Sequence, residues 1–290
     1  MFSGAMTALV TPFEDGQVDY DTLEDLVDFQ LEHGIDGIVP TGTTGESPTL
    51  SPDEHKSVIE RVVKAVDGQV PVIGGTGSNS TAEAIELTAY AKRVGADASL
   101  QVTPYYNKPT QEGFYEHFKA VAEEVDLPVV LYNIPGRCGA GMTPETIARL
   151  SEVENIVAVK EATGSLDQAS EIAMRCDIAI LSGDDSLTLP LASVGGRGVI
   201  SVVANIVPAD VKAMTDLILE GDLVSARKWH KKLFALSKNL LTLATNPIPI
   251  KAALGMLDMC SEELRLPMTP LAEDKRETLE QGLRDYGLLK

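Results

Sequence analysis

The sequence has few of the residues that build disulfide frameworks and metal sites. Its three cysteines, Cys138, Cys176 and Cys260, are far apart and form no C-x-x-C pair. Its four histidines are equally scattered, at positions 33, 55, 117 and 230. An odd number of isolated cysteines is not the pattern of a disulfide-stabilised fold, and this spacing of cysteines and histidines does not indicate a zinc site.

Long apolar runs are also missing. No stretch approaches the roughly 20 residues that a helix needs to cross a bilayer. The first 13 residues lack the basic start and the small-residue cleavage site of a signal peptide. We therefore expect a cytoplasmic protein that does not enter a membrane.

Positive charge is the third shortage, because 24 basic residues stand against 43 acidic ones, for a formal net charge of −19. Such a surface repels phosphate backbones and anionic lipids, which argues against nucleic-acid and membrane binding. It also repels anionic metabolites, so a site for one must carry local positive charge. The acidic excess is compatible with an ordinary soluble surface and with adaptation to high salt.

What the sequence does contain is a regular alternation of strand and helix patterns. Such alternation predicts parallel strands joined by crossover helices. Eight units over roughly 220 residues match a (β/α)₈ TIM barrel, whose usual length is about 250 residues. An open doubly wound sheet is the alternative, but the glycine-rich segment 74–79 lacks the third glycine of a dinucleotide fingerprint. The expected strands are 4–10, 35–40, 70–74, 97–103, 127–132, 156–160, 178–182 and 198–203.

Helix starts are marked by capping residues. Ser51 with Glu54, and Ser80 with Glu83, have the spacing of a capping box. From about Gly221 the pattern is purely helical, with helices expected at 222–243, 250–257 and 276–288. We therefore expect an α/β protein with a catalytic barrel at 1–221 and a C-terminal helical extension at 222–290.

Lys160 ends the apolar run 156–159, which has the pattern of a strand buried on both faces. Ser165 and Gln168 then mark the next helix, so Lys160 stands at the C-terminal end of its strand. Burial favours the neutral amine, which attacks carbonyl carbon to form a Schiff base. Lowering a lysine pKa by about three units takes about 4 kcal/mol of environment. The simpler interpretation is a lysine that reaches solvent or pairs with Glu161.

In a barrel of this kind the chemistry belongs at the C-terminal ends of the strands. Each polar residue there has an ordinary structural explanation, but together they suit carbonyl chemistry. A lysine that forms an imine needs a proton carrier, which a tyrosine linked to hydroxyls provides, and an arginine fork binds a carboxylate. The residues expected on this rim include Thr43, Thr44, Tyr105, Tyr106, Tyr132, Arg137, Lys160, Gly183 and Ile200.

Six motifs resemble those of the dihydrodipicolinate synthase (4-hydroxy-tetrahydrodipicolinate synthase) family. They are G-T-T-G-E at 42–46, T-P-Y-Y-N-K-P at 103–109, L-Y-N-I-P-G-R at 131–137, V-K-E-A-T-G at 159–164, S-G-D-D at 182–185 and N-P-I-P-I-K at 246–251. Two of them, G-T-T-G-E and the lysine strand, are shared with other class I pyruvate-dependent aldolases. The resemblance covers essentially the whole chain. It implies a homotetrameric (β/α)₈ lyase without metal or cofactor, which condenses pyruvate with L-aspartate 4-semialdehyde in lysine and diaminopimelate biosynthesis.

The resemblance also assigns roles to residues. Lys160 would form the imine with pyruvate, and Tyr132 would donate and accept protons. Thr43 and Tyr106 would complete a proton relay, with Tyr106 reaching the site of a neighbouring subunit. Arg137 would hold the carboxylate of the semialdehyde. The substrate-binding residues implied are Thr44, Arg137, Gly183 and Ile200.

A regulatory site is implied as well. Lysine-sensitive members of the family bind L-lysine at a subunit interface. Tyr105 and Tyr106 are adjacent, so in an extended segment they point to opposite sides and can serve two sites. Glu83 would pair with the ammonium of lysine, unless it only closes a capping box. Pro48 and Pro52 depart from the sensitive type, so we expect partial inhibition. The residues that match this allosteric site are Ser47, His55, Asn79, Glu83 and Tyr105.

Two other functions are compatible with the sequence. One is a sugar-acid lyase, which cleaves rather than condenses, although the P-G-R-C-G context of Arg137 suits aspartate semialdehyde better. The other is a barrel without catalytic activity that serves in binding or as a scaffold.

Overall fold

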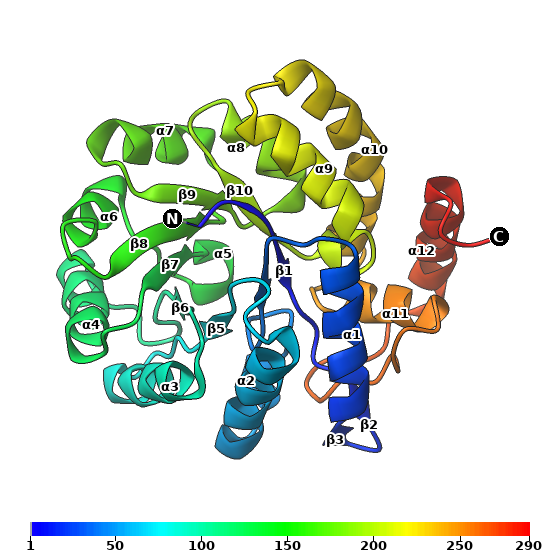
Figure 1. The fold of residues 1–290 in the computed structure, drawn as a ribbon, viewed down its shortest axis with the longest axis horizontal. Helices are drawn as coiled ribbons and strands as arrows, with labels where there is room; N and C mark the ends of the chain where they lie inside the picture. Colours follow the sequence, from blue (N-terminus) through cyan, green and yellow to red (C-terminus); the bar gives the residue numbers. More distant parts are fainter. Residues whose placement is uncertain (1) are drawn as a thin grey trace.

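The computed structural model describes residues 2–290, which form a barrel of eight parallel strands surrounded by helices (Figure 1). All eight predicted strands are present, so the predicted barrel is confirmed. The strands are β1 Gly4–Ala8, β4 Gly37–Val39, β5 Ile73–Gly75, β6 Ala98–Val102, β7 Val129–Asn133, β8 Ile156–Glu161, β9 Ala179–Ser182 and β10 Gly198–Ser201.

The barrel closes between β4 and β5, the two ends of the strand order β4-β1-β10-β9-β8-β7-β6-β5. Ile38 forms an isolated parallel bridge with Val72, and the Gly75 backbone N–H donates to the Pro40 carbonyl at 3.0 Å. A Cβ at Gly75 would lie 2.4 Å from the Thr41 carbonyl oxygen, so only glycine permits this approach. The alternative of an open doubly wound sheet is therefore wrong.

The helices that follow the strands pack around the barrel and cover its outer face (Figure 1). The capping box predicted at Ser51 is confirmed, because the Ser51 side chain accepts from the Glu54 N–H and the Glu54 carboxylate from the Ser51 N–H. Ser165 is also an N-cap, and its side chain accepts from the Gln168 N–H. The helices around the barrel are α1 Tyr20–Glu32, α2 Pro52–Val66, α3 Thr81–Val94, α4 Gln111–Glu124, α5 Pro135–Cys138, α6 Pro144–Leu150, α7 Leu166–Arg175, α8 Thr188–Ala192 and α9 Pro208–Leu219.

The second predicted capping box is wrong. Ser80 is the N-cap of α3, but its side chain makes no capping hydrogen bond. The carboxylate of Glu83 accepts instead from the Ser78 hydroxyl at 2.5 Å. The sequence also gave no sign of the short hairpin β2 Phe13–Glu14 and β3 Gln17–Val18, because strands of two residues are too short to show an alternating pattern.

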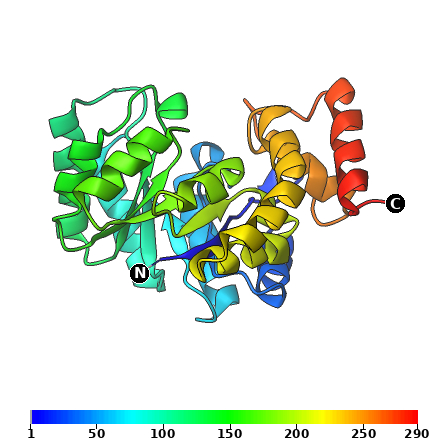
Figure 2. The same cartoon turned by 90° about the horizontal axis from the view of Figure 1, so that it is seen from above.

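Three helices follow the barrel, as predicted: α10 Leu223–Thr242, α11 Ile248–Met256 and α12 Glu273–Tyr286. They stand to one side of the barrel in both ribbon views (Figures 1 and 2). Leu236 of α10, Ile250 of α11 and Leu279 of α12 belong to one buried apolar cluster with Leu26 of α1 and Val211 of α9. The extension and the barrel are therefore joined by a common core.

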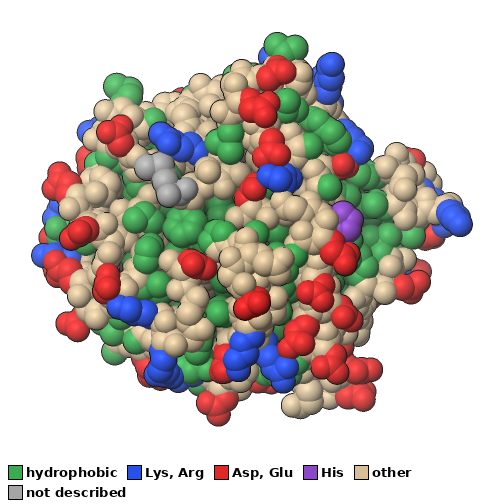
Figure 3. Space-filling model, in the orientation of Figure 1, with side chains coloured by type: hydrophobic (Ala, Val, Ile, Leu, Met, Phe, Trp, Pro, Cys, Tyr) green, Lys and Arg blue, Asp and Glu red, His purple; other side chains and the backbone are tan. Residues whose placement is uncertain are grey.

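Acidic side chains gather over α1 on the face shown in Figure 3, in keeping with the net charge of −19. Within residues 2–290, no helix is both long enough and apolar enough to span a membrane.

Candidate active site

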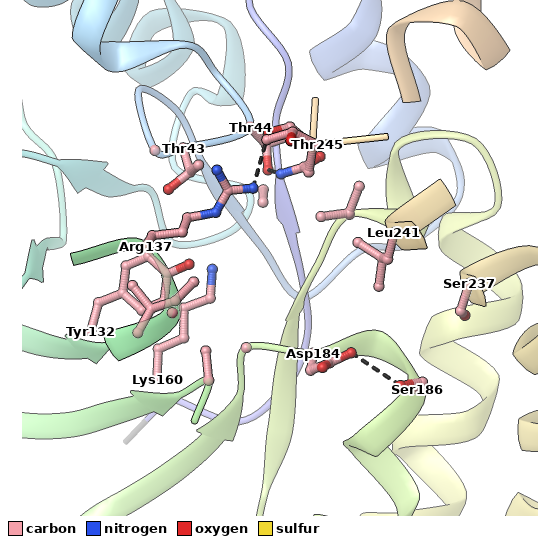
Figure 4. Close-up of a pocket in the computed structure, with 18 of the residues that line it drawn as sticks. Thr43, Thr44, Tyr132, Arg137, Lys160, Asp184, Ser186, Ser237, Leu241 and Thr245 are labelled. Carbon is pink, nitrogen blue, oxygen red and sulfur yellow. Dashed lines mark hydrogen bonds between the residues drawn. The ribbon is translucent and has the colours of Figure 1, made fainter. Parts of the chain in front are cut away.

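A cavity of about 840 Å³ opens at the C-terminal ends of the barrel strands. Its walls come from strand ends, from the loop after β4, from α5, and from α10 of the extension (Figure 4). The sequence predicted the strand-end residues but not the helical wall. The predicted site residues that line the cavity are Thr43, Thr44, Tyr132, Arg137, Lys160 and Gly183.

Lys160 points into the barrel, because side chains alternate along β8 and Ala158 belongs to the inner core while Val159 packs in an outer one. Lys160 is buried, with only 6% of its surface exposed. Desolvation lowers its pKa to about 8; the nearby Asp185 opposes this effect and the charge of Arg137 adds to it. Among residues 2–290, no carboxylate forms an ion pair with Lys160, so the simpler interpretation of pairing with Glu161 is wrong. The neutral amine is therefore more abundant near pH 7 than it is for an exposed lysine.

Tyr132 stands beside Lys160 on the neighbouring strand β7, where the two residues are paired in register. The Lys160 Nζ lies 4.2 Å from the centroid of the Tyr132 ring. Burial raises the pKa of Tyr132 to about 12, while the Arg137 charge and a hydrogen bond with the Thr43 side chain oppose this rise. A buried hydroxyl linked to a second hydroxyl is suited to carrying protons to and from a group bound at Lys160.

Arg137 extends from α5 toward the Thr43–Thr44 loop (Figure 4). Its Nη2 donates to the Asn246 carbonyl at 3.0 Å, and the Asn246 side-chain amide donates to the Thr44 hydroxyl at 3.0 Å. Asn246, which belongs to the C-terminal extension, therefore holds Arg137 and Thr44, two predicted substrate-binding residues of the barrel. The sequence showed its motif, N-P-I-P-I-K, but gave Asn246 no role.

Gly183 leaves room for the lysine. A Cβ at this position would lie 2.7 Å from the Ala162 Cβ and 3.1 Å from the Lys160 Cε. Ile200 is buried in the inner core of the barrel and is not among the residues that line the cavity, where Val202 takes part instead. Asp185, which has no predicted role, accepts from the Val202 N–H at 3.0 Å and from the Ser201 hydroxyl.

Tyr106 does not reach the cavity of its own chain. It is 91% exposed and has a left-handed backbone with φ of 72°. Its neighbour Tyr105 lines a second cavity, so the two tyrosines do face different surroundings. The extended segment on which this prediction was based is wrong, because the backbone turns at Tyr106.

The second cavity, of about 370 Å³, adjoins the first. It contains four of the five residues predicted for a regulatory site, namely Ser47, His55, Glu83 and Tyr105. Asn79 does not line it, but its side-chain amide donates to the Tyr105 carbonyl at 3.1 Å. The His55 ring nitrogen Nε2 lies 2.7 Å from the Gly75 carbonyl oxygen, and burial lowers the His55 pKa.

The two cavities share Thr43, Ile134 and Arg137 as wall residues. A molecule bound in the second cavity therefore lies against residues that shape the first. Pro48 and Pro52, which depart from the expected pattern, also line the second cavity. Among the residues that the structure describes, no cluster of three or more His, Cys, Asp or Glu side chains is placed to hold a metal ion.

Comparisons of the chain with family models, curated proteins and solved structures all identify the same family. The model of the dihydrodipicolinate synthetase family matches residues 1–285. The 4-hydroxy-tetrahydrodipicolinate synthase of Pelobacter propionicus is 55% identical over 291 residues, covering 100% of both chains. The dihydrodipicolinate synthase of Acinetobacter baumannii, solved in complex with pyruvate and described as chloride inhibited, is 45% identical with a TM-score of 0.97, covering 100% of both chains. That of Cyanidioschyzon merolae, solved with lysine bound, is 44% identical with a TM-score of 0.96, covering 99% of both.

Burial of Lys160 should cost stability. Lowering its pKa from 10.5 to about 8 corresponds to roughly 3 kcal/mol. Lys160→Met should therefore raise the free energy of unfolding at pH 7 by about 1–3 kcal/mol. The unfolded chain binds the extra proton between pH 8 and 10.5, so wild-type stability rises with pH there and the advantage of the variant shrinks.

Thermal unfolding of both proteins at pH 7, 8 and 9.5 measures this difference. The exposed Lys231→Met is the matched control, for which we expect a small effect that does not vary over this range. A destabilised Lys160→Met protein would show that the ammonium is well solvated in the fold.

Proposed function

The chain belongs to the dihydrodipicolinate synthetase family, and on this premise we propose that it condenses pyruvate with L-aspartate 4-semialdehyde through an imine on Lys160. The product is 4-hydroxy-tetrahydrodipicolinate, and the pathway is lysine and diaminopimelate biosynthesis. The observation that carries the proposal is the buried amine of Lys160, which lies over the Tyr132 ring in a cavity that also contains Arg137.

The reaction begins when the neutral Lys160 amine attacks the keto carbon of pyruvate. The resulting carbinolamine loses water to give the imine, and Tyr132 supplies and removes the protons, assisted by Thr43. The burial that lowers the Lys160 pKa makes the neutral amine available near pH 7. A nearby Arg137 charge supports both groups, because it favours the neutral amine and lowers the Tyr132 pKa.

Loss of a proton from the methyl carbon of the imine gives an enamine. This carbon attacks the aldehyde of the second substrate and forms the new carbon–carbon bond. The amino group of the semialdehyde then attacks the imine carbon and displaces the Lys160 amine, which closes the ring and frees the enzyme. No step requires a redox change.

Both substrates carry a carboxylate, so their binding needs positive charge and hydrogen-bond donors within an acidic protein. We assign Thr44 and the Ile200 backbone to pyruvate, and Arg137 to the carboxylate of the semialdehyde. Gly183 is a further substrate-binding position. The Arg137 guanidinium can offer two parallel donors to a carboxylate. Its hydrogen bond to the Asn246 carbonyl holds it in the cavity wall.

The proposed assembly is a homotetramer in the cytoplasm. Tyr106 would enter the relay of a neighbouring subunit, which accounts for an aromatic side chain that is 91% exposed on a strained loop. Assembly and activity are linked under this proposal, because each relay is incomplete without a second chain.

Feedback inhibition by L-lysine is the proposed regulation, supported by the lysine-bound relative. Glu83 would pair with an ammonium of lysine, and Tyr105 and Asn79 would hold its carboxylate, next to Ser47 and His55. Glu83 has no capping role at Ser80, so its carboxylate is held toward the second cavity by the Ser78 hydroxyl.

Borohydride treatment in the presence of pyruvate should attach the reduced pyruvyl group to the peptide that contains Lys160. Peptide mass spectrometry locates the label, and Lys160→Met should abolish it. The control is Lys231→Met, which removes an exposed lysine and should retain the label. A label elsewhere would contradict the mechanism.

Tyr132→Phe should lower kcat by about 10²-fold or more, the usual effect of losing positioned acid–base catalysis. The ring remains, so folding and packing should survive. Steady-state kinetics with both substrates measure the effect, and Tyr115→Phe on the outer helix α4 is the control. Full activity of Tyr132→Phe would show that this tyrosine has only a structural role.

L-Lysine should inhibit the enzyme partially, and Glu83→Ala should weaken this inhibition without changing the apparent affinity for pyruvate. Titration of L-lysine in the synthase assay measures both. Glu86→Ala, an exposed change on the same helix, should leave inhibition unaltered. A wild-type rate that stays constant up to tens of millimolar lysine would refute the regulatory site.

A further inference from the structure

Two charged residues at the ends of quoted motifs have no part in the proposed reaction. Glu46 ends G-T-T-G-E after β4, and Lys251 ends N-P-I-P-I-K in α11. Both are buried, with side-chain exposures of 2% and 0%, although charged side chains are almost never fully buried unless they are paired. Glu46 stands at the end of the loop that carries Thr43 and Thr44, so the burial of these two charges there needs an explanation.

The two side chains form an ion pair between the loop and the extension. The Lys251 Nζ lies 2.7 Å from the Glu46 Oε1 and also donates to the Glu263 carbonyl at 2.7 Å. It stands 4.0 Å from the centroid of the Phe13 ring. The ammonium is thus surrounded by a carboxylate, a carbonyl and an aromatic face.

Arg265 supports the same carboxylate from the segment after α11. Its backbone N–H donates to the Glu46 Oε2 at 3.2 Å, and its guanidinium donates to both oxygens of Glu54 in α2. It also donates to the Thr49 carbonyl at 3.0 Å. Both ends of the segment 46–54 are therefore tied to the extension.

The segment held in this way follows directly after Thr43 and Thr44. Glu46 has a left-handed backbone with φ of 53°, which is unfavourable for a residue other than glycine. Its N–H donates to the Thr43 carbonyl at 3.1 Å, which closes the loop. Strain of this kind persists only where the surroundings fix it. The Asn246 contact to Thr44 adds a further tie to the extension.

We infer that the Glu46–Lys251 ion pair is a positioning device, which holds the Thr43–Thr44 loop in register with Tyr132 and Lys160 from the C-terminal extension. This inference rests on the proposed function. Neither residue lines the main cavity, so both act through the loop and not on the substrate. The Lys251 end of the pair explains why an appendage outside the barrel contributes to the barrel's chemistry.

A purely stabilising pair is the competing explanation. Replacement of a buried ion pair by neutral groups of similar volume is often neutral or favourable for stability, so stability alone is a weak reason to keep one. Loss of position, in contrast, is costly for catalysis, because misplacement by about 1 Å can lower a rate by about 10²-fold. Measurements of kcat and of thermal stability therefore separate a positioning role from a purely stabilising one.

The experiment replaces the pair by Glu46→Gln with Lys251→Met, which keeps the side-chain lengths and an acceptor for the Arg265 N–H. We expect a folded protein in which kcat falls by about 10- to 100-fold at saturating pyruvate and semialdehyde. Borohydride should still trap pyruvate on Lys160, because neither substituted residue lines the cavity and the amine stays buried at the end of β8. Circular dichroism at the assay temperature verifies folding. If the double variant does not fold, Glu46→Gln alone takes its place in the assay. Lys251 then has no carboxylate partner, but it can become neutral in its buried site by losing its proton.

The control is Asp36→Asn with Lys212→Met, which removes a part-buried ion pair next to the other end of β4. Its kcat should equal that of the wild type. A Glu46 variant that melts at a lower temperature but keeps wild-type kcat and KM would overturn the positioning role, and so would an equal loss in the control. A wild-type protein that traps no pyruvate and has no synthase activity would overturn the proposed function itself, and the inference with it.

Discussion

Desolvation of one amine is the constraint on which the site depends. The barrel interior removes water from Lys160 and lowers its pKa to about 8, and the same environment raises the pKa of Tyr132 to about 12. Burial therefore prepares the nucleophile and makes the neighbouring hydroxyl a weaker acid. The Arg137 charge acts favourably on both, and the bond with Thr43 partly restores the acidity of Tyr132. This compensation requires Arg137 and Thr43 to keep their places.

Those places are set by contacts that cross from barrel to extension. Asn246 accepts from Arg137 and donates to Thr44, and the Glu46–Lys251 pair fixes the end of the same loop. The barrel seam between β4 and β5 lies beside this loop, with Gly75 packed against the Thr41 carbonyl. The loop thus sits where the sheet has its fewest ladder contacts, which explains why it is held from outside the barrel.

The common walls of the two cavities link regulation to chemistry under the proposed function. Thr43 and Arg137 face both spaces, so a ligand that alters their positions in the second cavity alters the relay and the carboxylate clamp in the first. A ligand shifts such an equilibrium only as far as its affinities for the two arrangements differ. With a net charge of −19, the wider surface does not attract anions such as pyruvate. The positive charge of Arg137 in the cavity wall is therefore more important for binding.

The sequence by itself determined the eight strands, the three extra helices and the position of Lys160 at a strand end, because periodicity and capping are local signals. It could not assign the cap of α3, where Ser78 displaces Ser80 as the partner of Glu83, since two nearby hydroxyls compete. Only the tertiary structure joined Asn246 to Thr44 across 202 positions and made α10 a wall of the cavity. Such contacts depend on where the closed barrel places distant backbones, which no local pattern encodes.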